Sequence, residues 1–413
     1  RLSKGRAGGR RGGLAVGAGR ALVRTVPSRA WPAVPALPPP ELADVRDRWA
    51  RGPLASRDWA ERALQWELIG GVQDGWATDM LLDAAASEAD PRVLVHVLGG
   101  LSGRDAERVT PALSAALADV RWLVRAAAVL ALESTPSRAG VDRLVALFET
   151  EQGRLLDDAA RALKRLTGQG FGTNGVQWRN WWAGAREGWT GPPEPVAAAG
   201  DAEEGPPDQD AAWKEPEKAP GERHTGFFGI DTRSLRRVYV IDVSGSMNEK
   251  MGEVTRADAA EGEVKRSVAA LEDGALFNIV FFAEDVRIWR KEMVVAGPDT
   301  RGAAVEYIAG VAVTGGTNTF DALTAAFDLG DVGRGKKRGE DPGGDAQVDT
   351  IILLSDGKPS VGALTDPGAI RRAIAELNHT RRIAIHTVAF GKDADTAFLG
   401  GLAEDAGGTS VAK

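Results

Sequence analysis

From residue 226 to the end of the chain, long apolar runs alternate with helical stretches, and this alternation constrains the fold more than any other feature. The runs "RVYVID", "ALFNIVFF", "DTIILLS" and "RIAIHTVAFG" are almost continuously apolar and rich in β-branched residues, and "VRIW" is a shorter strand candidate. Continuous runs of this kind are typical of a parallel sheet that helices cover on both faces. We therefore predict a doubly wound α/β domain with a mainly parallel sheet over residues 226–413. Its helices are expected at 257–271, 320–329, 367–377 and 395–406.

Small polar side chains follow these strands at the points where the strands end. Asp242, Ser244 and Ser246 follow the first run, Thr317 follows two glycines before a predicted helix, and Asp356 closes the run "DTIILLS". Ligands of doubly wound sheets bind at the carboxyl ends of the strands, so these two carboxylates and three hydroxyls are expected to converge. A set of oxygen ligands with two negative charges suits a hard divalent cation such as Mg²⁺.

The segments "DVSGSM", "GGTNT" and "LSDG" resemble, in order and spacing, the metal-ion-dependent adhesion site of von Willebrand factor A domains. The resemblance covers about residues 226–413 and implies a Rossmann-like fold. It implies that Ser244 and Ser246 bind the metal directly and that Asp242 and Asp356 act largely through waters. The resemblance also implies that Thr317 binds the metal in some conformations of the domain and not in others. The implied ion is Mg²⁺, with Mn²⁺ or Ca²⁺ as alternatives.

Two departures from the family pattern stand out. Ser355 occupies a position where the family often has threonine. The family also tends to close with a helix after the last strand, whereas this chain stops at "TSVAK", so we expect that helix to be absent.

Residues 41–189 carry a helical pattern that recurs along the chain. Segments such as "ADPRVLVHVLGGL" and "ADVRWLVRAAAVLAL" start alike, and second helices such as "GVDRLVALFET" lie between them. A repeat with two helices per unit predicts an all-α solenoid, in which small alanines at the seams let helices approach closely. The Asp–x–Arg start and the alanine/leucine helices resemble HEAT repeats.

An aromatic cluster follows the last repeat, with Trp178, Trp181 and Trp182 at helical spacing. We interpret these side chains as a core that caps the open end of the solenoid. The alternative is an exposed aromatic patch that binds a ligand.

Two further segments have the composition of disordered chain. Residues 1–40 are basic and proline-rich, and residues 190–225 hold seven prolines, nine acids and three bases, which predicts an extended linker. The basic segment is interpreted as a disordered tail, with a nucleic-acid arm as the alternative. The chain begins with Arg1 rather than Met, so we expect a fragment or a processed product.

Composition excludes several classes of protein. With no cysteine, the chain has no disulfide, thiolate metal site or cysteine nucleophile. No catalytic serine or phosphate-loop motif occurs, and His96, His224, His379 and His386 show no ligand spacing, so each is predicted to be structural. No run approaches the roughly 18 apolar residues of a membrane helix and no clear signal peptide is present, so we expect a soluble chain of undetermined compartment.

These features predict a non-enzymatic interaction protein. A partner protein's Asp or Glu would complete the coordination of the cation, and the repeats would offer a second surface. One alternative is an RNA-binding protein like the Ro ribonucleoprotein, which also joins helical repeats to an A domain. A net charge of −7, with 18 Lys/Arg against 21 Asp/Glu in residues 41–190, disfavours nucleic acid and anionic membranes as partners. A second alternative, an adaptor for an AAA-type ATPase, stays open.

Overall fold

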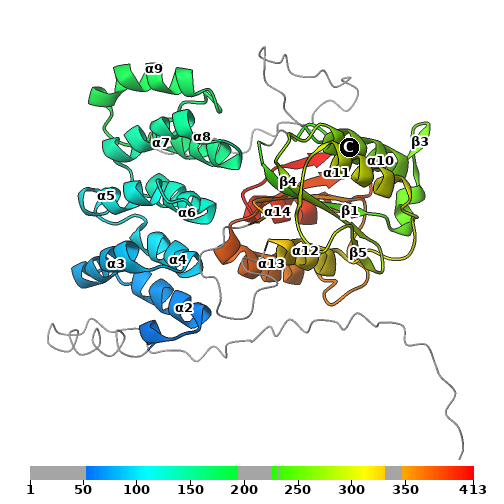
Figure 1. Ribbon diagram of the computed structural model, residues 1–413, viewed down its shortest axis with the longest axis horizontal. Coiled ribbons are helices and arrows are strands. Elements are labelled where there is room, and N and C mark those ends of the chain that lie inside the picture. Colours follow the sequence, from blue (N-terminus) through cyan, green and yellow to red (C-terminus); the bar gives the residue numbers. More distant parts are fainter. Residues whose placement is uncertain (1–52, 194–225, 231–232, 331–346) are drawn as a thin grey trace, which may run out of the picture. The chain divides into compact units, whose positions relative to one another are not determined.

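The computed structural model describes residues 53–193, 226–230, 233–330 and 347–413, which form a helical-repeat domain followed by an α/β domain (Figure 1). The predicted tail at 1–40 and nearly all of the predicted linker at 190–225 lie outside the described residues, so both stay predictions. Residues 331–346, a polar, glycine-rich stretch before the strand that ends at Ser355, also lie outside the described residues. Among the described residues, no helix is long and apolar enough to cross a membrane.

The helical-repeat domain begins with a short 3₁₀ helix, η1, and then stacks its helices in two rows. One row contains α2, α4, α6 and α8, and the other contains α3, α5, α7 and α9, with each helix contacting the next in its row. The prediction of a HEAT-like solenoid is confirmed. The elements are η1 (Pro53–Ala55), α2 (Trp59–Gly70), α3 (Gly75–Ser87), α4 (Pro91–Leu101), α5 (Ala106–Ala116), α6 (Trp122–Glu133), α7 (Arg138–Thr150), α8 (Arg154–Thr167), α9 (Gly175–Ala185) and η2 (Arg186–Gly188).

Local sequence explains where several of these helices start. Asp58, Asp90 and Asp105 each precede a first turn and accept a hydrogen bond from the backbone N–H two residues ahead. Small residues explain how closely neighbouring helices pack. A Cβ atom at Gly70 of α2 would lie 2.9 Å from the Cα of Gly100 in α4, so glycine is required where these helices cross.

The tryptophans of α9 confirm the core interpretation. Trp178 and Trp182 are buried, and Trp181 is partly buried. Trp178 stacks edge-to-face on Phe171, and the Trp182 Nε1–H donates to Asp142 Oδ1 at 2.7 Å. These side chains therefore seal the last repeat instead of forming an exposed patch.

The α/β domain is built on a sheet whose strand order is β5–β4–β1–β7–β8–β9, with β6 also pairing with β4. Strands β4, β1, β7, β8 and β9 run parallel, whereas β5 and β6 run antiparallel to β4. The predicted mainly parallel sheet is confirmed. The strands are β1 (Arg236–Asp242), β4 (Leu276–Phe282), β5 (Val286–Ile288), β6 (Val294–Val295), β7 (Thr350–Ser355), β8 (Ala384–Ala389) and β9 (Ser410–Ala412), and a separate hairpin pairs β2 (Lys250–Met251) with β3 (Val254–Thr255).

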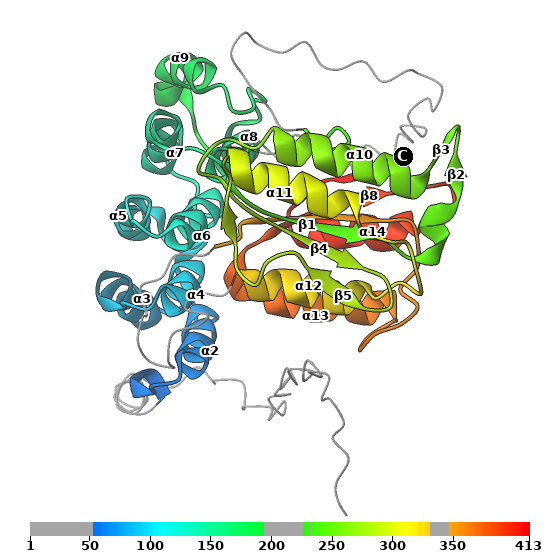
Figure 2. The same cartoon turned by 45° about the vertical axis from the view of Figure 1, so that its right-hand side comes forward.

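Each face of the sheet has its own apolar core, because alternate side chains of a strand point to opposite faces. On β1, Tyr239 and Ile241 pack in one core with α10 and α11, while Val238 and Val240 pack in the other with α12, α13 and α14. Figure 2 shows the helices in these two layers. Their bounds are α10 (Arg256–Ala269), α11 (Pro298–Ala309), α12 (Thr319–Leu329), α13 (Pro367–Arg381) and α14 (Thr396–Asp405).

Several elements were not predicted from the sequence. Within the terminal "TSVAK", Ser410–Ala412 form the edge strand β9 beside β8. Helix α11 was not predicted, because only Ala304 and Ile308 of its twelve residues are buried and its apolar stripe is correspondingly narrow.

Candidate functional site

The predicted site residues lie where two neighbouring parallel strands end. Strand β1 ends at Asp242, and the adjacent β7 ends at Ser355, directly before Asp356. Ser244 and Ser246 lie at the start of η3 (Gly245–Asn248), the short 3₁₀ turn that follows β1. The carboxylates are almost fully buried, at 0% exposure for Asp242 and 1% for Asp356, whereas Ser246 is partly exposed. The site therefore has a buried floor and an open side at Ser246.

Hydrogen bonds join these residues into one network, the oxygen cluster, whose polar side-chain atoms are all oxygens. The Ser244 N–H donates to Asp242 Oδ1 at 2.8 Å, and the Ser355 hydroxyl donates to Asp242 Oδ2 at 2.5 Å. The Ser244 and Ser246 hydroxyls lie 3.1 Å apart, and the Ser246 hydroxyl donates to Asp356 Oδ1 at 2.8 Å. The structure thus brings four of the five predicted ligand residues together. Ser355, noted as a departure, orients the carboxylate of Asp242.

Thr317 approaches the same site from the loop before α12. Its N–H donates to the Ser360 hydroxyl at 2.9 Å, which fixes the loop against the segment that follows Asp356. A Cβ atom built on Gly357 would lie 3.4 Å from Thr317 Oγ1 and 3.8 Å from Ser246 Oγ, so both hydroxyls border the space above this glycine. The Thr317 hydroxyl therefore borders the oxygen cluster, but no side-chain hydrogen bond joins Thr317 to the other four residues.

Arg256 is a site residue that the sequence did not reveal. It is the first residue of α10, and its side chain is 7% exposed. Its Nη1 donates to Asp356 Oδ2 at 2.8 Å, and its Nη2 pairs with Glu249 Oε2 at 2.9 Å and with Asp393 Oδ1 at 2.5 Å. Burial by itself lowers the pKa of Arg256, but the bonds to Asp356 and Asp393 raise it overall. A fixed positive charge therefore balances Asp356 in this conformation.

Comparison with known proteins identifies the two folded regions. Residues 237–412 match the family model of the von Willebrand factor type A domain. The α/β domain is a von Willebrand factor type A domain. Residues 78–164 match the model of HEAT repeats, which agrees with the stacked helices.

Curated relatives of the A domain include inter-alpha-trypsin inhibitor heavy chains. Human inter-alpha-trypsin inhibitor heavy chain H4 is 34% identical over 180 residues, which cover 44% of this chain and 18% of that protein. Human heavy chain H2 is 31% identical over 170 residues, covering 41% of this chain and 17% of that one. The chain thus spans less than a fifth of the length of these curated relatives.

Similar solved structures also align with the A domain. The von Willebrand factor type A structure from Catenulispora acidiphila is 24% identical, covers 45% of this chain and 40% of that chain, and has a TM-score of 0.35. Proximal thread matrix protein 1 from the mussel byssus, in a structure with a zinc-occupied MIDAS motif, is 18% identical with a TM-score of 0.31, covering 43% of this chain and 40% of that one.

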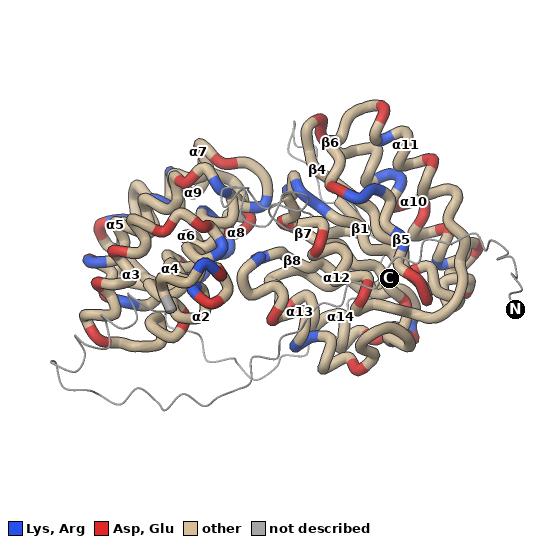
Figure 3. Tube along the Cα trace, turned by 60° about the horizontal axis from the view of Figure 1, so that its bottom comes forward, with Lys and Arg blue, Asp and Glu red and all other residues tan. Residues whose placement is uncertain are grey.

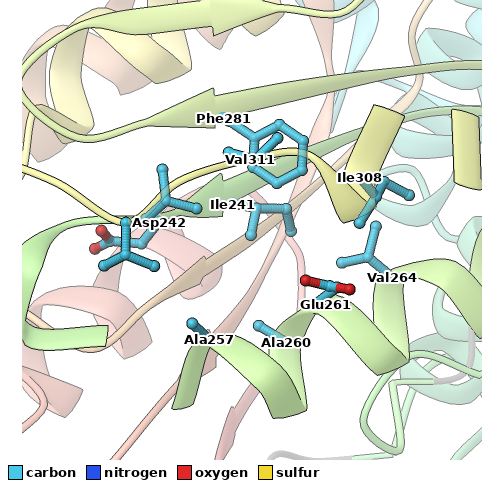
Figure 4. A pocket seen from close by; sticks show the side chains of 11 residues that line it. Ile241, Asp242, Ala257, Ala260, Glu261, Val264, Phe281, Ile308 and Val311 are labelled. Carbon is cyan, nitrogen blue, oxygen red and sulfur yellow. The ribbon is translucent and has the colours of Figure 1, made fainter. Parts of the chain in front are cut away.

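An apolar pocket lies behind the oxygen cluster of the A domain (Figure 4). Figure 4 shows the Asp242 carboxylate at one end of this pocket and Ile308 at the other, with Ile241 and Phe281 between them. Burial on this side, reinforced by the negative charge of Asp356, raises the pKa of Asp242 to about 6, although hydrogen bonds from Ser244 and Ser355 oppose the shift. Without a cation, Asp242 therefore ionises at a higher pH than an ordinary aspartate, although the ionised form still predominates at pH 7.

The pKa of Asp242 predicts a stability change that depends on pH. A folded pKa of about 6, against an ordinary value of 3.8, means that the folded state binds more protons between these pH values, so stability falls as pH rises through this window. Since asparagine carries no charge, Asp242→Asn is expected to stabilise the protein in EDTA at pH 7 by on the order of 2 kcal/mol. Urea unfolding at pH 7 and pH 4 measures the effect, which should vanish at pH 4. Destabilisation at pH 7 would show that the hydrogen bonds to the ionised carboxylate outweigh its burial.

His386 agrees with its predicted structural role. Its Nδ1 accepts a hydrogen bond from the Thr409 N–H at 3.0 Å, and burial lowers its pKa to about 4. It is therefore a neutral imidazole that ties β8 to the residue before β9.

Proposed function

We propose that the A domain binds one divalent cation, Mg²⁺ or Mn²⁺ with Ca²⁺ as an alternative, and docks an acidic side chain of a partner protein onto it. Asp242, Ser244, Ser246, Thr317 and Asp356 would hold the ion. The observation that carries this proposal is the hydrogen-bonded chain from Asp242 to Asp356, which places two buried carboxylates beside two hydroxyls at the ends of β1 and β7.

The donor set fits such an ion in charge and in hardness. All donors are oxygens, and the two carboxylates balance two positive charges while the hydroxyls add none. Since its ligands leave it electrophilic, the bound ion attracts one further anionic oxygen. Other residues of the A domain support this site: Ser355 orients Asp242, and mostly apolar side chains border Asp242 on its buried side.

The open side of the site suits a partner's carboxylate. Gly245 and Gly315 are exposed beside Ser246, and the Gly245 N–H donates to the Gly315 carbonyl at 3.0 Å. Because neither glycine carries a side chain, the approach to Ser246 is not obstructed by these residues. Loops around this opening would set the specificity of docking.

The helical repeats offer a second surface for a protein partner. Figure 3 shows Lys and Arg interspersed with Asp and Glu along the described repeat helices α2–α9, whereas RNA binding favours a clustering of basic residues. This distribution supports a protein partner over a nucleic acid. We propose no enzymatic activity for either domain.

Thr317→Val tests the docking step, because valine keeps the shape of threonine and removes only its hydroxyl. Both carboxylates survive, so the affinity for Mn²⁺ is expected to change by less than about fivefold, whereas capture of the partner should be lost. The measurement is affinity capture with immobilised full chain in Mg²⁺ and in EDTA. Thr314→Val, on the same loop but exposed, serves as the matched control. A partner that stays bound in EDTA, and that binds Thr317→Val as well as wild type, would dock elsewhere.

A further inference from the structure

Two histidines and a glutamate that are far apart in the sequence meet outside the oxygen cluster. Glu67 lies in the last turn of α2, His96 in α4, and His379 in the last turn of α13. Glu67 Oε1 is 2.7 Å from His96 Nδ1 and 2.5 Å from His379 Nε2. One ligand atom from each residue lies within 4.8 Å of the other two. No sequence motif predicts that these three residues meet, because two of them belong to the helical repeats and the third belongs to the A domain.

The packing of both domains holds this cluster in place. The crossing of α2 and α4 at Gly70 and Gly100 brings Glu67 close to His96. Arg154 of α8 is buried and donates to the carbonyls of Asp349 and Arg382 in the A domain, at 2.5 and 2.6 Å. These bonds join the repeats to the side of the A domain that carries His379.

The hydrogen bonds of His96 leave one nitrogen facing the glutamate. Its Nε2 lies 2.9 Å from the Thr380 hydroxyl, and its Nδ1 faces Glu67. When Nε2–H donates to Thr380, the lone pair of Nδ1 and the carboxylate oxygen face each other as two acceptors. Two acceptors at this distance require a cation between them, either a proton or a metal ion. Histidine ligands of metals usually donate their far N–H to an oxygen acceptor, and the Thr380 hydroxyl can take that role for His96.

We propose that Glu67, His96 and His379 bind one Zn²⁺ ion, with water as the fourth ligand, and that this ion ties the helical repeats to the A domain. Two imidazoles and one carboxylate form a donor set that suits Zn²⁺ and not Mg²⁺. This site is independent of the oxygen cluster and of its proposed cation.

The side chains have the freedom that the ion requires. Tetrahedral ligands of zinc lie about 3.3 Å apart, so the two contacts to Glu67 must widen by somewhat less than about 1 Å. The side chains of Glu67 and His379 are 37% and 55% exposed, so both can adjust and the ion can enter from solvent. Arg382 opposes binding because its positive group lies close enough to interact with the charge of Glu67. Burial lowers the pKa of Arg382 overall, and the charge of Glu67 offsets only part of that shift. We therefore expect micromolar rather than nanomolar affinity.

Titration of the metal-free full chain with Co²⁺ and then Zn²⁺, in excess Mg²⁺, tests the proposal. We expect one Co²⁺ per chain with the visible absorption of a nitrogen-ligated site, and displacement of that ion by Zn²⁺. His379→Ala and Glu67→Gln should weaken binding at least about 100-fold. His224→Ala, which lies outside the described residues, should bind as wild type does. Circular dichroism of each variant checks that it folds.

A variant of the oxygen cluster tests whether the two metal sites are independent. Zn²⁺ binding should persist when Asp356→Asn removes a carboxylate of that cluster, and it should be lost when His379→Ala is added. Equal affinities of wild type and His379→Ala, or no stoichiometric binding by wild type, would overturn the proposal. In the second case N–H groups of the two imidazoles donate separate hydrogen bonds to Glu67 instead.

Discussion

Asp356→Asn is expected to weaken Mn²⁺ binding to the A domain by at least about 100-fold. Asp356 is one of the two buried carboxylates of the oxygen cluster, and its Oδ1 accepts from Ser246 while its Oδ2 accepts from Arg256. Asparagine has nearly the same shape but carries no negative charge, so the four remaining ligands would hold a divalent ion with a single compensating carboxylate. Isothermal calorimetry of wild type and variant, with Zn²⁺ excluded, measures the loss.

The matched control for this experiment is an aspartate of the same domain that lies away from the cluster. Asp273 is 74% exposed in its ion pair with Arg301, so Asp273→Asn should leave Mn²⁺ affinity unchanged. Equal heats from wild type and Asp356→Asn would remove Asp356 from the site. A partial loss of about tenfold would show that Asp356 contributes less to cation binding than its charge predicts.

Arg256→Gln is expected to destabilise the protein strongly in EDTA and far less in Mg²⁺. The ion pair with Asp356 is buried on both sides, and removal of one partner of such a pair costs about 3–5 kcal/mol, because the other charge stays buried and unpaired. A bound cation would balance Asp356 in place of the guanidinium. The variant should therefore lose roughly 10 °C in Tm in EDTA and recover most of that loss in saturating Mg²⁺.

The same substitution should tighten cation binding. The positive charge of Arg256 lies beside Asp356 and repels an incoming cation. Removal of this charge is therefore expected to raise Mn²⁺ affinity by about tenfold or more. Arg266→Gln is the control, because this arginine lies on the same helix and its ion pair with Glu263 leaves it 73% exposed. If Arg256→Gln loses equal stability with and without Mg²⁺ and keeps wild-type affinity, Arg256 is only a structural partner of Asp356.

The sequence predicted the features of this protein that depend on local pattern. The buried strands are visible because they are continuous β-branched runs, and Asp242 and Asp356 are visible because they follow such runs directly. Adjacent parallel strands then bring these two carboxylates together without any further information. The predicted ligand residues therefore converge as expected, although the binding of a cation is still a prediction.

The features that the sequence did not predict depend on chain folding over longer distances. Arg256 reaches Asp356 because the hairpin β2–β3 turns the chain back before α10 begins, and no motif marks that return. His96 and His379 meet because the two domains pack together, and the hydrophobic periodicity of the sequence does not predict how domains pack. The helix α11 was missed for a simpler reason, since a helix with two buried residues looks polar in sequence.

The most direct test of the central claim is the position of a bound ion in a crystal of the full chain grown with Mn²⁺. Anomalous scattering is expected to show one Mn²⁺ ion about 2.2 Å from the hydroxyl oxygens of Ser244 and Ser246, between the carboxylates of Asp242 and Asp356. In that state Asp356 should no longer depend on Arg256 alone for its balancing charge. An absence of anomalous density at this edge of the sheet, at Mn²⁺ concentrations that saturate the protein in solution, would contradict the account.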